Sequence, residues 1–334
     1  MNAEVPGLDE ARLAVTAAAM IGDAGNLYHI VSGLLSAGMP FDAVLFDVLT
    51  PVGHDIGLRW EQGDCLVSEE HAATAAIETL VSLLAGSFDQ PHNGRHIVVA
   101  AAEGDTHSLP PRLIAAHLLA LEHRTVLLGG DVLASDLREY LDDEPPDAVV
   151  LSCAMTSHLL GAREVIRASH AAGAPVLAGG AAFGQNSRRA TMLGADAWAP
   201  TGRDVPHVLA SWDPDPRAAE AGAAEPSEEL AALTERRVSV IAAAQEELTA
   251  RGLPAGEPRL TTEISLLLGA VEGWLLVGDD EVIADMHRWQ ETTLAAHGYD
   301  VRGAIPAALH GALASVAPVA AQALARATGA TSGR

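Results

Sequence analysis

Five short β-rich runs alternate with helical segments between residues 96 and 199, and this rhythm constrains the fold of the 334-residue chain more than any other feature. Short strands separated by helices are typical of a parallel, doubly wound sheet with helices on both faces. We therefore predict one α/β domain in the middle of the chain. The predicted strands are 96–102, 125–128, 148–151, 175–178 and 195–199.

The chain on both sides of the predicted sheet has a helical pattern. Residues 1–88 are rich in alanine and broken by glycine, which predicts a small helical bundle. Residues 213–227 contain mainly proline, alanine, glycine and acids, the composition of a linker. Residues 228–330 carry apolar stripes at helical spacing. The predicted fold class is α/β plus all-α, with the sheet domain at 94–212 between two helical parts.

The charged residues narrow the possible partners. Acidic residues number 44 and basic residues 20, for a net charge of −24, and every basic residue is an arginine. The absence of lysine excludes Schiff-base, pyridoxal-phosphate and Walker-A lysines, and the acidity argues against nucleic-acid binding. Cys65 and Cys153 are too few for a disulfide framework or a thiolate zinc site. Without a signal-peptide pattern or an apolar run of about 18 residues, we expect a cytoplasmic protein that does not enter a membrane.

The loop after the first predicted strand carries the most specific polar pattern, because Asp105 stands two residues before His107. A carboxylate at this spacing can accept a hydrogen bond from one imidazole nitrogen and leave the other free to ligate a metal. Ligands of parallel sheets bind beyond the carboxyl ends of the strands, where this loop lies. Taken alone, the pair also fits an ordinary loop histidine, since Asp-x-His occurs by chance.

Small residues follow the third and fourth predicted strands. Ser152 ends the third, and Gly179 and Gly180 end the fourth, where missing side chains let a large planar ligand approach the backbone. Together with Asp105 and His107, these residues resemble the pattern of the cobalamin-binding domain: Asp-x-His-x-x-Gly, then Ser-x-Leu, then Gly-Gly. The resemblance implies a Rossmann-like (flavodoxin-like) fold and cobalamin as the cofactor.

The resemblance also implies roles for single residues. His107 would be the lower cobalt ligand in place of dimethylbenzimidazole, with Asp105 as its hydrogen-bond partner. Ser108 and Leu109, in the same loop, are expected to contact the cofactor. The pocket for the displaced nucleotide tail is expected at Ser152, Gly179 and Gly180.

Two positions depart from the cobalamin pattern within residues 94–212, the part of the chain that the resemblance covers. Pro110 stands where the family has glycine, and Ala154 stands where it has leucine. The proline lies in the turn beside the nucleotide loop. We therefore expect the geometry of the tail pocket to differ from that in the family more than the cobalt ligation by His107 does.

The N-terminal helices add a second pattern, in which Trp60 is followed ten and eleven residues later by Glu70 and His71. An indole can lie over one face of a macrocycle, and a carboxylate–imidazole pair can hydrogen-bond an adenosyl group. The alternative is a core tryptophan and a solvated helix start. Next to a cobalamin domain, this spacing resembles the cap of the B12-dependent photoreceptors, which covers the upper ligand of adenosylcobalamin or a related alkylcobalamin.

The chain also differs from the light-dependent repressors of that class. In those proteins a histidine after the tryptophan ligates cobalt after photolysis, whereas this chain has Glu61. They also carry an N-terminal winged-helix DNA-binding domain, which we do not expect here. A bis-histidine adduct through residue 61 and a nucleic-acid partner are therefore not expected.

A photosensory unit followed by a helical C-terminal domain resembles the photocobilins, which combine cobalamin with a bilin. The resemblance makes Trp274, His287 and Trp289 the candidate bilin contacts, and arginines the partners of its propionates. Since no cysteine follows Cys153, a bilin such as biliverdin would be bound there without a thioether. The alternative is that these side chains serve helix packing and a dimer face.

These patterns predict a cobalamin-dependent light sensor rather than an enzyme. Loss of the upper ligand in light would relax the cap and change the C-terminal domain or an interface, so the expected partner is a protein effector or the chain's own C-terminal domain. A homodimer is expected. The alternatives are a corrinoid methyl carrier of a methyltransferase system and a plain cobalamin-binding module.

Overall fold

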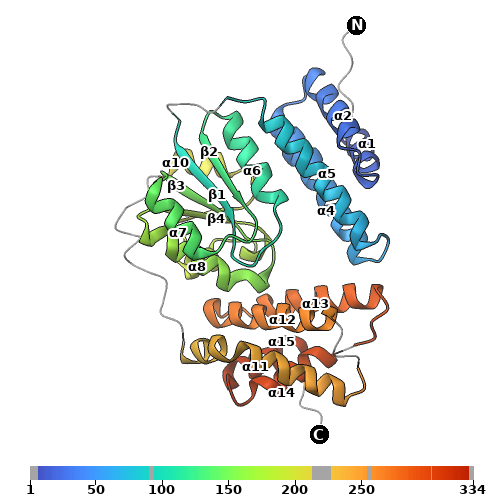
Figure 1. Cartoon of the computed structure of the whole chain (residues 1–334), viewed down its shortest axis with the longest axis vertical. Helices are drawn as coiled ribbons and strands as arrows, with labels where there is room; N and C mark the ends of the chain where they lie inside the picture. The colour runs from blue at the N-terminus through green and yellow to red at the C-terminus, as the bar shows by residue number, and fades with distance from the viewer. Residues whose placement is uncertain (1–6, 90–93, 213–226, 254–257, 302, 331–334) are drawn as a thin grey trace.

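The chain folds into an N-terminal group of helices, a central sheet with helices on both faces, and a C-terminal group of helices (Figure 1). The computed structural model describes all residues except 1–6, 90–93, 213–226, 254–257, 302 and 331–334. The predicted linker therefore lies outside the described residues apart from Ser227. This serine caps the next helix, because its hydroxyl accepts the backbone N–H of Leu230.

The N-terminal part is a helical bundle around a core of fully buried aliphatic side chains, among them Leu27, Leu45 and Ile56. A six-residue π-helix, Val44–Leu49, runs directly into the fourth helix, where Pro51 is tolerated in the first turn. The helices are α1 (Leu8–Met20), α2 (Ala24–Ser36), α3 (Phe41–Ala43), α4 (Thr50–Glu61) and α5 (Val67–Ala85).

All five predicted strands form, and they pair in parallel in the order β2-β1-β3-β4-β5. This is the flavodoxin-like order, and it confirms the predicted fold class. The strands are β1 (His96–Ala101), β2 (Arg124–Gly129), β3 (Ala148–Ser152), β4 (Val176–Gly179) and β5 (Ala197–Ala199). The helices between and after them are α6 (Leu109–Ala120), α7 (Ala134–Asp143), α8 (Leu159–Ala171), α9 (Arg188–Leu193) and α10 (Val205–Ser211).

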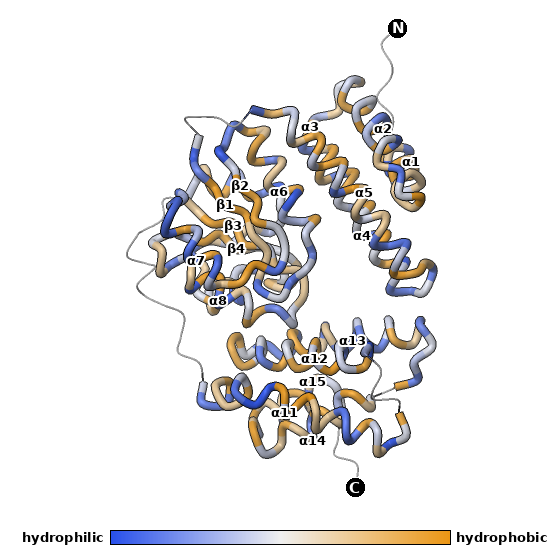
Figure 2. Tube along the Cα trace, viewed as in Figure 1, coloured by the Kyte–Doolittle hydropathy of each residue, from blue (hydrophilic) through white to orange (hydrophobic). Residues whose placement is uncertain are grey.

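The central strands β1, β3 and β4 are buried on both faces, which explains why they are apolar along most of their length, whereas the edge strand β2 is mostly half-buried (Figure 2). In β1, alternate side chains enter different cores. Ile97 and Val99 pack with α6 and α10, whereas Val98 packs with α7 and α8 on the other face. The carboxyl ends of the strands thus lie between two layers of helices, and the loops that follow them are free to form a site.

Helix α6 belongs to two cores at once. Leu109, Leu113 and Ala116 pack into the N-terminal bundle, while Ile114 and Leu118 pack on the sheet. This double burial explains a helix that carries apolar residues on nearly every side. It also fixes the bundle against the loop that precedes α6.

The C-terminal helices α12 and α13 form the layer that faces the rest of the molecule (Figure 1). Gly269 and Gly273 let α12 approach the turn after β3 closely. A Cβ on Gly269 would collide with the Ser157 carbonyl oxygen, and one on Gly273 would lie 3.1 Å from that of Thr156. The helices are α11 (Glu228–Ala250), α12 (Pro258–Val277), α13 (Glu281–Ala296), α14 (Ala304–Leu313) and α15 (Pro318–Thr328).

Helix α12 is the one described helix whose length and composition would allow it to cross a membrane. In this structure, 61% of its apolar window is buried inside the protein, and it carries the buried carboxyl groups of Glu263 and Glu272. It is thus the central helix of the C-terminal domain.

Candidate functional site

Asp105 and His107 form a tightly bonded pair in the loop after β1, as the sequence predicted. Asp105 is 1% exposed. Its Oδ1 atom accepts hydrogen bonds from His107 Nδ1 at 2.7 Å and from the His107 backbone N–H at 3.1 Å, and Oδ2 accepts the Ala154 N–H at 2.6 Å. Since a carboxylate can only accept, Nδ1 carries the proton and Nε2 is left with its lone pair. Half of the His107 side chain is exposed, so it can ligate a metal.

The electrostatics of the pair agree with this geometry. Burial raises the pKa of Asp105, but the hydrogen bonds from His107 and Ala154 outweigh it and bring the pKa below its ordinary value. The hydrogen bond to Asp105 raises the pKa of His107 against the effect of burial, and the charges of Asp105 and Glu70 raise it further. Asp105 is therefore ionised, and it fixes the orientation of the ring.

The small residues at the ends of β3 and β4 lie side by side, because Ser152 is the register partner of Gly179. Gly180 has a φ of +108°, and a Cβ there would collide with the Cys153 carbonyl oxygen. A Cβ on Gly179 would lie 3.2 Å from the Ala199 carbonyl oxygen. These positions accept glycine alone or nearly so. With a free imidazole nitrogen beside it, this edge of the sheet fits a large metal-centred cofactor such as cobalamin.

The two departures from the cobalamin pattern have simple structural explanations. Pro110 lies in the first turn of α6, where its missing N–H would have no helical partner. Ala154 uses its backbone N–H to bind Asp105, a contact that any residue except proline can make. Neither residue disturbs the Asp105–His107 pair.

The loop that carries His107 is held by the N-terminal bundle. The Ser108 hydroxyl donates a hydrogen bond to the Glu78 carboxylate of α5, and the Leu109 side chain lies against Gly53 of α4. The structure thus shows Ser108 and Leu109 in contact with the bundle, a pairing that the sequence did not reveal. Their contact with the cofactor stays a prediction.

Glu70 and His71 lie near the start of α5, about two turns before Glu78, which binds this loop. Glu70 is 21% exposed and accepts a hydrogen bond from Thr74, and its charge acts on His107. His71 is 74% exposed, with Nε2 at 3.6 Å from the Glu70 carboxylate. The carboxylate and the imidazole therefore lie close together, and their contact with a cofactor stays a prediction.

Trp60, at the end of α4, packs against the C-terminal domain. Its ring centroid lies 6.1 Å from that of Trp289 and 5.5 Å from that of His297. The Trp289 indole N–H donates to the Glu61 carboxylate at 2.8 Å. Sequence reasoning singled out each aromatic residue but not their meeting, because more than 200 residues separate the two sides.

The three candidate bilin contacts have different surroundings. Trp289 lies at the bundle, whereas Trp274 donates its indole N–H to Asp280 at 2.7 Å, beside the start of α13. His287 is half-buried, and burial lowers its pKa. A bilin site that uses all three residues therefore stays a proposal.

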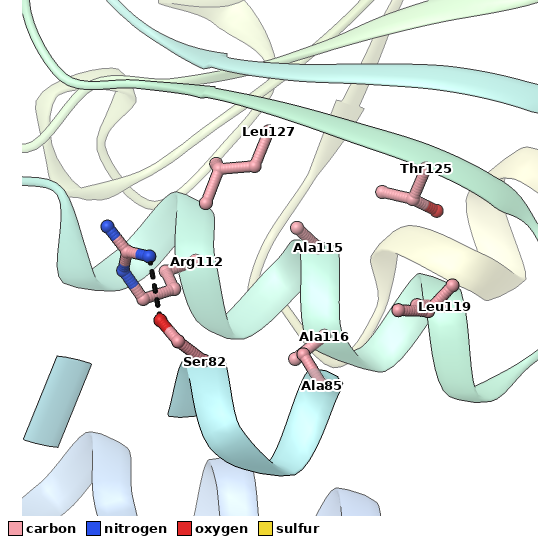
Figure 3. A pocket seen from close by; sticks show the side chains of 8 residues that line it. All are labelled: Ser82, Ala85, Arg112, Ala115, Ala116, Leu119, Thr125 and Leu127. Atoms are coloured by element: carbon pink, nitrogen blue, oxygen red, sulfur yellow. Dashed lines mark hydrogen bonds between the residues drawn. The ribbon is translucent and has the colours of Figure 1, made fainter. Parts of the chain in front are cut away.

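A separate pocket of about 230 Å³ lies between α5, α6 and β2 (Figure 3). At the edge of the pocket, the Arg112 guanidinium donates a hydrogen bond of 3.0 Å to the Ser82 hydroxyl. None of the predicted site residues lines this pocket.

Within the described part of the chain, no group of three or more histidine, cysteine or carboxylate side chains could hold a metal ion.

Comparison with known proteins gives the same result as the geometry. The model of one B12 binding domain matches residues 95–209, and that of a second B12 binding domain matches residues 13–85. The chain therefore contains cobalamin-binding domains, and the sheet and the bundle are both parts of them.

The relatives belong to two kinds of protein. The HTH-type transcriptional repressor CarH of Myxococcus xanthus is 32% identical over 182 residues, which are 53% of this chain and 60% of the repressor. The match thus spans less than two thirds of that relative. The monomethylamine corrinoid protein of Methanosarcina barkeri matches with a TM-score of 0.52 and 20% identity, over 61% of this chain and 99% of the other. This second likeness shows a shared fold.

Proposed function

We propose that this protein is a cobalamin-dependent light sensor. The observation that carries the proposal is the joint presence of the Asp105–His107 pair and a bundle with Trp60, Glu70 and His71. The bundle resembles the cap of the B12-dependent photoreceptors, and the similarity to the repressor CarH supports this assignment. An alkylcobalamin, when bound, supplies a cobalt–carbon bond that light breaks.

The residues of this chain would act on the two sides of the cofactor. His107 would hold the cobalt through Nε2, with its ring fixed by Asp105. Glu70 and His71 would hydrogen-bond the upper ligand from above, and Trp60 would exclude water from it. Without that ligand, these three side chains would lack a packing partner, and the cap could relax. The C-terminal domain, which contacts Trp60, would receive the change.

A bilin in the C-terminal domain is the finer part of the proposal. Trp274, His287 and Trp289 supply flat apolar surface and a polar group, and arginines such as Arg259 supply cations. Biliverdin would be bound without a thioether, because Cys153 is the last cysteine of the chain. Reconstitution with biliverdin should give an absorbance band in the red that Trp289→Ala weakens. If the reconstituted protein shows no red band, the proposal that it binds a bilin is wrong.

The second candidate function is a corrinoid methyl carrier, which the fold of the monomethylamine corrinoid protein supports. A carrier must present its upper face to a partner enzyme. In this chain the C-terminal helices pack on Trp60, the residue proposed to cover that face, and this contact favours the sensor.

The test is reconstitution with adenosylcobalamin in the dark, followed by green light and absorbance spectra. The sensor should show a lasting spectral change, and hydrogen exchange should increase in the bundle. His107→Ala should alter the spectrum of the bound cofactor, whereas the exposed His207→Ala should not. If light leaves the spectrum unchanged while a methyl donor methylates the reduced cofactor, the carrier function is right and the sensor is wrong.

A further inference from the structure

The bundle and the C-terminal domain meet at a cluster of rings around one guanidinium group. We call Trp60, Arg259, Trp289, His297 and Tyr299 the seam cluster. The Arg259 Cζ atom lies 5.7 Å from the ring centroid of Trp60 and 5.6 Å from that of Tyr299. The cation is thus in contact with rings of both domains, at distances where cation–π attraction acts.

Arg259 has few competing partners. The side chain is 25% exposed, and its Nε and Nη2 atoms are buried without a hydrogen-bond partner among the described residues. The Glu263 carboxylate, on the same helix, forms an ion pair with Nε at 3.8 Å, a distance too long for a hydrogen bond. The guanidinium thus lies between aromatic rings of the two domains, with the Glu263 carboxylate of its own helix as an ion-pair partner.

Other contacts keep this seam closed. The Trp289 indole N–H donates to Glu61, the residue next to Trp60. Gly63 has a φ of +76°, and a Cβ there would lie 2.9 Å from the Ala296 carbonyl oxygen. The turn after α4 therefore touches the end of α13 with no room for a side chain.

The C-terminal domain is anchored independently to the sheet domain. Arg189 Nε donates to Asp279 at 2.9 Å, and the buried Thr156 hydroxyl donates to the Val282 carbonyl at 3.0 Å. Asp279 and Val282 stand at the start of α13, whereas the seam cluster lies near its end. Helix α13 thus spans from the domain that carries His107 to the cap residue Trp60.

We propose that Arg259 and Trp289 are positioning residues for Trp60, so that the C-terminal domain sets how closely the cap covers the upper face of the cofactor. This inference depends on the proposed placement of Trp60 over that face. Since coupling between two sites is reciprocal, whatever moves Trp60 also loosens the C-terminal domain at the seam. The anchored end of α13 then stays fixed while the seam end responds.

The test compares two cobalamins that differ in the size of the upper ligand. Dissociation constants of the full chain for adenosylcobalamin and for hydroxocobalamin are measured in the dark. Arg259→Ala should reduce the preference for adenosylcobalamin about three- to tenfold, the effect of one or two cation–π contacts. Hydroxocobalamin binding should change little, because its small upper ligand does not reach Trp60. Arg259→Lys should restore part of the preference, since it keeps the cation.

Matched variants separate positioning from general stability. Arg288→Ala removes an arginine of α13 whose ion pairs among the described residues are with Glu281 and Asp285, and it should leave the preference unchanged. Trp289→Phe, which removes the hydrogen bond to Glu61, should lower the preference. If Arg259→Ala destabilises the protein but keeps the wild-type preference, Arg259 is merely structural and the inference is wrong.

A measurement without cofactor tests the contact itself. In a double-mutant cycle of Trp60→Ala and Arg259→Ala, the unfolding free energies of the apoprotein should be non-additive. Additive values would overturn the inference. If the wild-type protein binds both cobalamins in the dark but light does not change its spectrum, the proposed light sensor is wrong, and the binding test of Arg259 and Trp289 still applies. Failure to bind either cobalamin would overturn both.

Discussion

Asp105→Asn changes one buried carboxylate into an amide of the same shape and tests how the site holds His107, the proposed metal ligand. The carboxylate accepts three hydrogen bonds, two from His107 and one from Ala154. An asparagine oxygen can take the place of one carboxylate oxygen. Its amide nitrogen is a donor and would meet either the imidazole N–H or the Ala154 N–H, so at least one bond is lost.

The size of the effect follows from these contacts. A hydrogen bond to a charged group contributes about 1.5–3 kcal/mol. Loss of the partner of a metal-bound histidine typically weakens metal binding about 10- to 100-fold, which is about 1.4–2.8 kcal/mol. The two ranges overlap, so we expect the dissociation constant for hydroxocobalamin to rise about 10- to 100-fold in Asp105→Asn.

The assay is an absorbance titration of the apoprotein with hydroxocobalamin in the dark at neutral pH, with circular dichroism as a check of folding. Asp131→Asn is the matched control. Asp131 accepts the Gly104 N–H at 2.9 Å in the neighbouring loop and has a φ of +51°, which asparagine tolerates. Its binding should stay within about twofold of wild type. A folded Asp105→Asn variant that binds as tightly as wild type would refute the role of Asp105.

Two further predictions concern stability. Gly180→Ala should destabilise the protein by about 2–4 kcal/mol in urea unfolding, because its φ is +108° and the new Cβ would collide with the Cys153 carbonyl; a loss below about 0.5 kcal/mol would contradict this geometry. Burial raises the pKa of Glu272, although the charge and hydrogen bond of Arg237 oppose this rise. The favourable contribution of protonated Glu272 to the free energy of unfolding is therefore present below the ordinary glutamate pKa, and it is lost as the pH rises through the raised pKa. The stability of Glu272→Gln should therefore rise relative to that of wild type as the pH increases from acidic to neutral. If the unfolding free energies of the two proteins depend on pH in the same way, the prediction is wrong.

The parts of the site that the sequence predicts well are those encoded locally. Each predicted strand ends within about two residues of an observed one, because apolar runs bounded by loop residues mark buried strands directly. The Asp105–His107 bond is equally local, since two residues of one loop suffice to form it. Ser152 and Gly179 become neighbours as soon as the strands are parallel, because both end their strands.

The contacts that sequence reasoning did not reveal all join distant segments. Ser108 meets Glu78, and Trp60 meets Arg259 and Trp289, across 30 to more than 200 residues. Spacing and composition carry no signal for such pairs, which depend on how preformed helices dock. The π-helix 44–49 was also not predicted, because a single wide turn changes the helical period too little to be seen in one sequence.

The double burial of α6 has a consequence for how the chain can be divided. A fragment of residues 1–88 would leave the bundle without Leu113 and Ala116, and a fragment of residues 94–212 would put those same side chains in water. Either excision would expose an apolar surface that promotes aggregation. The smallest independently stable unit is therefore the pair of modules together, which should melt in one cooperative step. Expression of these two modules apart from the C-terminal helices should therefore use residues 7–212 as one unit.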